Sequence, residues 1–179
     1  AANTKAVVDK LEQYGMNYID TARGYTVSEE YLGAALEGRR DKFILATKSM
    51  ARDKESMAKD IDISLKNLRT DYIDVYQIHN LPENEIGKVF GEGGAWEALE
   101  EAKAAGKIGH LGVTAHNADA LKKMIELHGD KIETIMFPYN IVEIHGHEVL
   151  KKAKEMDIGT IAMKPMAGGN LDDWNLALR

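Results

Sequence analysis

Residues 16–30 read MNYIDTARGYTVSEE. The apolar run MNYI has the length and composition of a short buried strand, and it ends directly on a carboxylate, Asp20. A turn containing Arg23 and Gly24 follows and leads to a phenol, Tyr25. Because the strands of a parallel sheet end at one edge, a strand that ends on such side chains indicates a functional site there.

Further apolar runs of strand length follow along the chain. They are residues 43–47 (FILAT), 72–78 (YIDVYQI), 110–114 (HLGVT), 134–137 (TIMF) and 159–163 (GTIAM). Between them, apolar residues recur at helical spacing, as at Met57, Ile61 and Leu65. Alternating strands and helices predict βαβ units around a parallel sheet, either doubly wound or closed as a (β/α)8 barrel.

Helix boundaries are also marked in the sequence. Asn117 precedes a helical segment and is the residue type that caps helix N-termini. Four glycines stand where helical segments should stop, as glycines beyond a helix C-terminus do. They are Gly15, Gly38, Gly106 and Gly129.

Composition narrows the class of protein. With 179 residues and 44% apolar content, the chain can bury one sizeable core, and we predict a single domain over residues 1–179. The net charge of -6 argues against a nucleic-acid partner. The absence of cysteine excludes disulfides and thiolate metal sites, and HGH at residues 145–147 lacks a third metal ligand, so we expect no metal. No apolar run reaches the ~20 residues that span a bilayer, and we expect a cytoplasmic protein without a membrane partner.

Polar side chains gather at the ends of the predicted strands. Each one alone could be a helix cap or a solvated loop residue, but a barrel would bring all of them to one mouth. They are Asp20, Lys48, His79, Thr114, His116, Asn140 and Lys164.

The motifs around these residues resemble the aldo-keto reductase superfamily, and its bacterial oxidoreductase branch in particular. GMNYIDTARGY, FILATK and DYIDVYQIH carry the resemblance, and GKIGHLGVTAHN, PYN and IGTIAMKPMAGG extend it. The resemblance implies a (β/α)8 barrel, here incomplete with about six βα units and lacking the family's first and last strands. It also implies reduction of a small aldehyde or ketone with NADP, NAD being the alternative.

The resemblance further implies a catalytic tetrad of Asp20, Tyr25, Lys48 and His79. In that hypothesis Tyr25 is the general acid that protonates the carbonyl oxygen. Lys48 lowers the pKa of the phenol, and Asp20 pairs with Lys48. His79 orients the carbonyl or relays the proton.

Cofactor-binding residues are implied in the same way, in place of a Rossmann glycine motif, which the sequence does not contain. They are Thr114, His116, Met163, Lys164, Pro165, Met166 and Gly168. Ala115, Met136 and Met163 depart from the residues that many family members use to contact the nicotinamide ring.

Two other functions fit the same residues. A Schiff-base lyase would use Lys164 or Lys48 as an amine nucleophile. A non-catalytic protein, either a cofactor-binding subunit or an inactive partial barrel, would keep the fold without turnover. A Schiff-base lyase would form a substrate adduct that borohydride traps. A non-catalytic protein would bind a nicotinamide cofactor without oxidising it.

Overall fold

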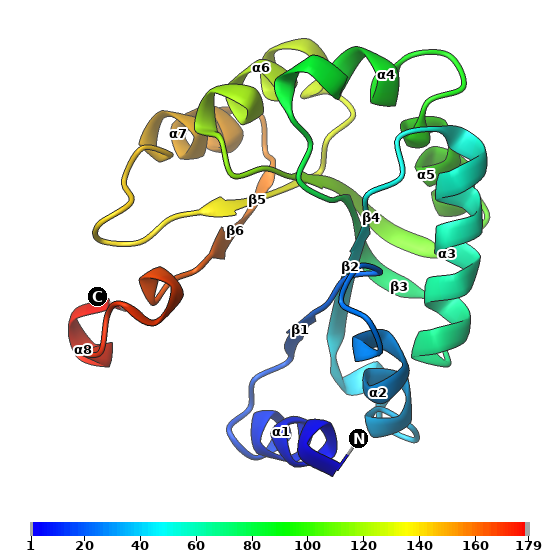
Figure 1. Cartoon of the computed structure of the whole chain (residues 1–179), viewed down its shortest axis with the longest axis vertical. Coiled ribbons are helices and arrows are strands. Elements are labelled where there is room, and N and C mark those ends of the chain that lie inside the picture. The colour runs from blue at the N-terminus through cyan, green and yellow to red at the C-terminus, as the bar shows by residue number, and fades with distance from the viewer. Residues whose placement is uncertain (1, 178–179) are drawn as a thin grey trace. The chain divides into compact units, whose positions relative to one another are not determined.

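The computed structural model describes residues 2–177 and shows an α/β chain (Figure 1). Its contacts form two compact units. The first contains the chain up to His79 together with Gly87–Leu111, and the second contains Asn80–Ile86 and the chain from Gly112 onwards. Within residues 2–177, no helix is long and apolar enough to cross a membrane.

The first unit is built on parallel strands paired in the order β1-β2-β3. Asp20 at the end of β1 pairs with Ala46, and Lys48 pairs with Gln77. The elements are α1 (Ala2–Gln13), β1 (Tyr18–Asp20), α2 (Ser28–Ala35), η1 (Arg40–Lys42), β2 (Ile44–Ser49), α3 (Lys54–Leu68), β3 (Ile73–Ile78) and α5 (Ala95–Ala104), with α4 (Ile86–Phe90) and β4 (Ile108–Thr114) shared between the units.

The second unit has the same design. The end of β4 pairs in parallel with β5, and β5 pairs in parallel with β6. Helices α6 and α7 pack against each other on one side of these strands (Figure 1). The elements are η2 (Glu83–Glu85), α6 (Ala118–His128), β5 (Thr134–Pro138), α7 (His147–Glu155), β6 (Gly159–Met163), η3 (Ala167–Gly169) and α8 (Trp174–Ala177).

All the predicted strands are present, with one change that matters for the site. Lys48 does not follow its strand but lies inside β2, because the ladder with β3 continues to Ser49. The sequence marked the end of helix α2 at Gly38, but it did not mark its start at Ser28, shortly after the tyrosine turn. The prediction of a single domain over residues 1–179 is not tested by this division into units and stays a prediction.

The predicted helix ends are confirmed. The Asn117 side chain accepts hydrogen bonds from the backbone of Asp119 and Ala120, as an N-cap does. Gly15, Gly38 and Gly106 adopt the left-handed conformation beyond their helices, with φ of 69°, 74° and 75°.

Helix α6 also ends at the predicted glycine, Gly129, but this residue is not left-handed, because its φ is -64°. A side chain is excluded there for a different reason. A Cβ atom would lie 2.5 Å from the backbone oxygen of Ile125 and 2.5 Å from the Met156 side chain. Gly129 is therefore required by close packing and not by backbone conformation.

Helices α2, α3 and α5 cover one face of β2 and β3 (Figure 1). Because side chains alternate along a strand, Thr47 and Ser49 point to this helix-covered face, where they bond to residues of α2 and α3. Lys48 lies between them and points to the opposite face. Strand β2 thus presents one set of polar residues to the helices and another to the candidate site.

Helix α2 approaches the end of α3 so closely that only glycine fits at residue 33. A Cβ atom on Gly33 would lie 2.2 Å from the backbone oxygen of Asn67. Backbone cannot move aside as a flexible side chain can, so overpacking here is costly.

We therefore expect Gly33→Ala to lower the free energy of unfolding by about 1–3 kcal/mol. Gly87→Ala is the matched control, because Gly87 also lies in a helix but a Cβ atom there meets nothing within 4 Å. The control should be neutral or stabilising, since alanine favours helix. Urea unfolding measures both variants, and equal stabilities for the two would contradict the close contact.

Candidate active site

An ion pair between a buried lysine and a partly exposed aspartate lies at the carboxyl ends of β1 and β2. The Lys48 side chain is 2% exposed, and its Nζ lies 2.5 Å from Asp20 Oδ2. The same Nζ donates a second hydrogen bond, of 2.8 Å, to the backbone oxygen of Thr21. A buried ammonium requires such partners, because an unpaired charge inside a protein is strongly unfavourable.

Tyr25 reaches this pair from the turn after β1. Lys48 Nζ lies over the face of the Tyr25 ring, 5.4 Å from its centroid. The His79 ring, directly after β3, meets the Tyr25 ring edge-on, with centroids 5.8 Å apart and planes at 84°. The structure therefore brings together Asp20, Lys48, Tyr25 and His79, which the sequence predicted to share a site.

Burial shifts the acid–base properties of two of these groups. It raises the pKa of the Asp20 carboxyl, although Lys48 opposes this effect. Burial first, and the charge of Asp20 second, also raise the pKa of the Tyr25 phenol above its ordinary value of 10.0. The net shift of the Tyr25 pKa is therefore upward, opposite to the direction hypothesised from Lys48, whose charge is compensated by Asp20 and lies over the ring face.

The backbone around the turn is closely tied to β2. The amides of Thr21 and Arg23 donate to the backbone oxygens of Ala46 and Lys48, each at 2.9 Å. The amide of His79 donates to the backbone oxygen of Ser49 at 2.8 Å. These bonds continue the strand pairing beyond the strands themselves and fix the segments that carry the candidate catalytic side chains.

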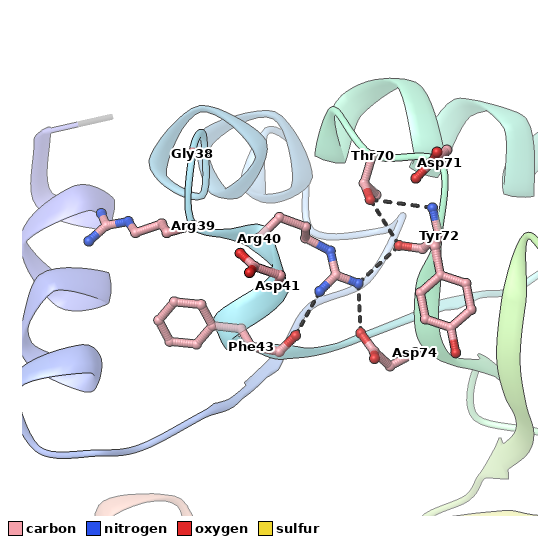
Figure 2. A pocket seen from close by; sticks show the side chains of 9 residues that line it. All are labelled: Gly38, Arg39, Arg40, Asp41, Phe43, Thr70, Asp71, Tyr72 and Asp74. Carbon is pink, nitrogen blue, oxygen red and sulfur yellow. Dashed lines mark hydrogen bonds and ion pairs between the residues drawn. The ribbon is translucent and has the colours of Figure 1, made fainter.

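The other end of the same strands carries a separate cavity of about 590 Å³ (Figure 2). Its centre is Arg40, which donates to the backbone oxygens of Phe43 and Tyr72 and to the Asp74 carboxylate. The same carboxylate oxygen, Asp74 Oδ2, also accepts a 2.9 Å hydrogen bond from the backbone amide of Leu45. Since these bonds join the amino ends of β2 and β3, we assign Arg40 and Asp74 to the stability of the fold.

The predicted cofactor-binding residues lie in the second unit and differ in accessibility. Thr114 ends β4 and is fully buried, and its hydroxyl accepts a 2.8 Å hydrogen bond from the backbone amide of Asn80. This bond anchors the chain that follows β3. His116, by contrast, is exposed.

The segment after β6 is open to a ligand. Lys164 and Pro165 are exposed, and Met163 and Met166 are partly exposed. Gly168 has a φ of 68° and nothing within 4 Å of a Cβ position, so its backbone is uncovered. An exposed glycine and an exposed lysine in one short segment are a combination that suits a phosphate-bearing ligand.

Several polar residues near the site were not found from the sequence. Glu29 of α2 is 1% exposed and accepts hydrogen bonds from Thr47, Ser64 and Arg23. Its neighbour Glu30 is exposed, and the two carboxylates look alike in the sequence. The signal that was missed is helical spacing, because Glu29 lies on the same buried face of α2 as Leu32 and Gly33.

A model of the aldo/keto reductase family matches residues 1–178. The chain belongs to this family. Aldo-keto reductase YhdN of Bacillus subtilis is 34% identical over 88% of this chain. The holo form of aldo-keto reductase AKR11C1 from Bacillus halodurans superimposes with a TM-score of 0.81 at 29% identity over 92% of this chain. An aldo/keto reductase from Klebsiella pneumoniae, solved in complex with NADP and acetate, superimposes with a TM-score of 0.80 at 26% identity over 97% of this chain.

This aldo/keto reductase chain spans only part of these relatives. It covers 50% of YhdN, 57% of the uncharacterized oxidoreductase YqkF of Bacillus subtilis, 58% of the AKR11C1 structure and 63% of the Klebsiella structure. The predicted fold class, an incomplete (β/α)8 barrel of α/β type, is confirmed by the structural likeness.

The raised pKa of Tyr25 gives a measurable expectation. Tyr25 should titrate above 10.0, because burial and the Asp20 charge favour the neutral phenol. The stability that this proton contributes is therefore fully present below the unfolded pKa near 10 and is lost as the pH rises through the folded pKa. The phenolate absorbance of the protein minus that of Tyr25→Phe measures the midpoint. A midpoint below 10.0 would show that the charge of Lys48 dominates.

Proposed function

We propose that this chain provides the catalytic residues of an NADP-dependent reductase that converts aldehydes or ketones to alcohols, with Tyr25 as the general acid. The observation that carries the proposal is the cluster of Tyr25, Lys48, Asp20 and His79 at the ends of adjacent parallel strands in a member of the aldo/keto reductase family. Fold alone does not define an activity, so the argument rests on this cluster.

Tyr25 supplies the proton. NADPH, when bound, supplies the hydride that adds to the carbonyl carbon, and negative charge then develops on the carbonyl oxygen. With an ordinary pKa of 10.0, which burial raises further, the Tyr25 phenol is protonated near neutral pH, and this is the state from which it can donate a proton. Its side chain is 48% exposed and is therefore accessible to a substrate oxygen.

Lys48 stabilises the Tyr25 phenolate that remains after the proton has been transferred. A phenolate beside the Lys48 ammonium, which lies 5.4 Å from the ring centroid, is favoured by charge attraction in a partly desolvated site. Asp20 holds the ammonium in place at 2.5 Å. In this proposal the attraction of Lys48 for the phenolate offsets part of the increase in the Tyr25 pKa that burial and the Asp20 charge cause.

His79 is the second group that faces the carbonyl. Its ring meets the edge of the Tyr25 ring, and its backbone is fixed to β2 through Ser49. A substrate oxygen that accepts a hydrogen bond from Tyr25 would lie within reach of the imidazole. His79 would orient that oxygen for hydride addition.

NADP is the proposed cofactor, and the segment from Met163 to Gly168 is its proposed binding loop. Lys164 is exposed and adopts a φ of 54°, and the Gly168 backbone is uncovered. Thr114 fits less well, because its hydroxyl is already buried against Asn80. We keep Thr114 and His116 as proposed contacts and place the main phosphate-binding role on Lys164. The exposure of Lys164 also disfavours a Schiff-base role, which needs a desolvated amine.

We expect Tyr25→Phe to lower the rate of carbonyl reduction by about 10²- to 10⁴-fold, because the general acid is lost. NADPH binding should be retained. The rate is followed as loss of reduced-nicotinamide absorbance with a panel of simple aldehydes, and binding as quenching of protein fluorescence.

Tyr14→Phe is the control for this experiment, because Tyr14 is an exposed tyrosine outside the site. It should leave the rate unchanged. If Tyr25→Phe retains most of the turnover, Tyr25 is not the acid. If the wild-type chain binds NADPH but reduces none of the carbonyls, the non-catalytic alternative replaces this proposal.

We expect Lys164→Met to weaken NADPH binding by about 10- to 100-fold, the effect of losing one charge-assisted hydrogen bond to phosphate. Lys154→Met, which removes an exposed lysine from α7, is the matched control and should bind normally. Fluorescence titration with NADPH and NADH measures both. Equal affinities for the two variants would remove Lys164 from the cofactor site.

A further inference from the structure

A buried carboxylate that the proposed reaction does not use lies behind the tyrosine turn. Glu29 is 1% exposed, and both of its carboxylate oxygens are bonded. Oε1 accepts from Thr47 Oγ1 at 2.9 Å and from Ser64 Oγ at 2.7 Å. Oε2 accepts from Arg23 Nη1 at 2.8 Å and from Asn67 Nδ2 at 3.3 Å. A buried charge with this many donors is strongly fixed in position.

A second carboxylate extends the network. Asp60 of α3 accepts a hydrogen bond from Ser49 Oγ, and its Oδ1 lies 3.8 Å from Arg23 Nε. The Arg23 guanidinium thus faces Glu29 of α2 and Asp60 of α3 together. Its fork of donors suits two such partners better than an ammonium group would.

Arg23 connects this network to the candidate active site. It lies in the turn between Asp20 and Tyr25, and its amide donates to the backbone oxygen of Lys48. Its side chain reaches the helix-covered face of β2, whereas Tyr25 lies over Lys48 on the opposite face. The turn therefore passes around the end of β2 and is held from both sides.

We propose that Glu29 and Arg23 are positioning residues for Tyr25. The buried carboxylate holds Arg23, Arg23 holds the turn, and the turn keeps the phenol against Lys48 and His79. The effect on rate rests on the proposed function, but the effect on the position of Tyr25 does not.

The chain offers a matched control for removing an arginine. Arg40 also pairs with a carboxylate, and its side chain is 21% exposed against 24% for Arg23. Its pair with Asp74 is 2.6 Å long, and the Arg23–Glu29 pair is 2.8 Å long. Arg40 acts at the amino ends of β2 and β3 (Figure 2), whereas Tyr25 contacts Lys48 and His79 at their carboxyl ends.

The experiment compares Arg23→Met with Arg40→Met in the 179-residue chain. The first readout is the set of nuclear Overhauser contacts between the Tyr25 and His79 rings, which lie 5.8 Å apart. We expect these contacts to be lost in Arg23→Met and kept in Arg40→Met at a similar loss of stability. In the active protein, kcat should fall about 10²-fold in Arg23→Met with NADPH affinity within twofold, as expected for a misplaced catalytic group.

Two more conservative substitutions test the proposal if Arg23→Met does not fold. Glu29→Gln can still accept from Thr47 and Ser64 through its oxygen, but it presents an amide nitrogen to Arg23 and Asn67. It should lose the ring contacts. Arg23→Lys keeps the charge near Glu29 and should recover them in part.

The proposal is overturned if the ring contacts persist in folded Arg23→Met or Glu29→Gln. It is equally overturned if Arg40→Met loses them to the same extent, because general destabilisation then explains the effect. A wild-type chain that shows the contacts but reduces no carbonyl contradicts the proposed function and leaves the positioning role standing.

Discussion

The ammonium group of Lys48 is buried at the end of β2, and its charge has to be compensated inside the protein. Asp20 from β1 and the Thr21 backbone provide that compensation. Because both partners stand where β1 ends, the end of β1 must lie beside β2, and the turn that follows must begin there. Tyr25 reaches the ring-face position over Lys48 as a consequence. The arrangement of the candidate active site thus follows from where one buried charge finds its partners.

Strand β2 separates two kinds of polar chemistry. Towards the helices, Thr47 and Ser49 bond to the carboxylates of Glu29 and Asp60. Towards the other face, Lys48 bonds to Asp20. The two sets are adjacent in the sequence and are kept apart only by the alternation of side chains along the strand. The candidate catalytic residues therefore stand on a scaffold whose supporting side is itself polar, and rigid polar support is what the proposed active site would require.

Apolar runs predicted the strands, and the common end of parallel strands predicted the grouping of Asp20, Lys48 and His79. The place of Tyr25 beside them was implied by the resemblance to aldo-keto reductases. The sequence did not predict the burial of Glu29, since a carboxylate at the start of a helix resembles any solvated acid until the packing of that helix is known. The anchoring of Thr114 by Asn80 was hidden for a similar reason, because the two are distant in the chain.

The hydrogen bonds that Asp74 accepts from Arg40 and Leu45 form a clamp that depends on the register of the sheet. The Asp74 carboxylate accepts a hydrogen bond from the amide of Leu45, one residue before the ladder of β2 and β3 begins at Ala46 and Val75. A slip of one residue in register would break this side-chain bond and would also turn every β2 side chain to the other face. Lys48 would then enter the helix-covered side, away from Asp20. The clamp and the Lys48–Asp20 pair, at opposite ends of the strands, are therefore satisfied by the same alignment of β2 and β3.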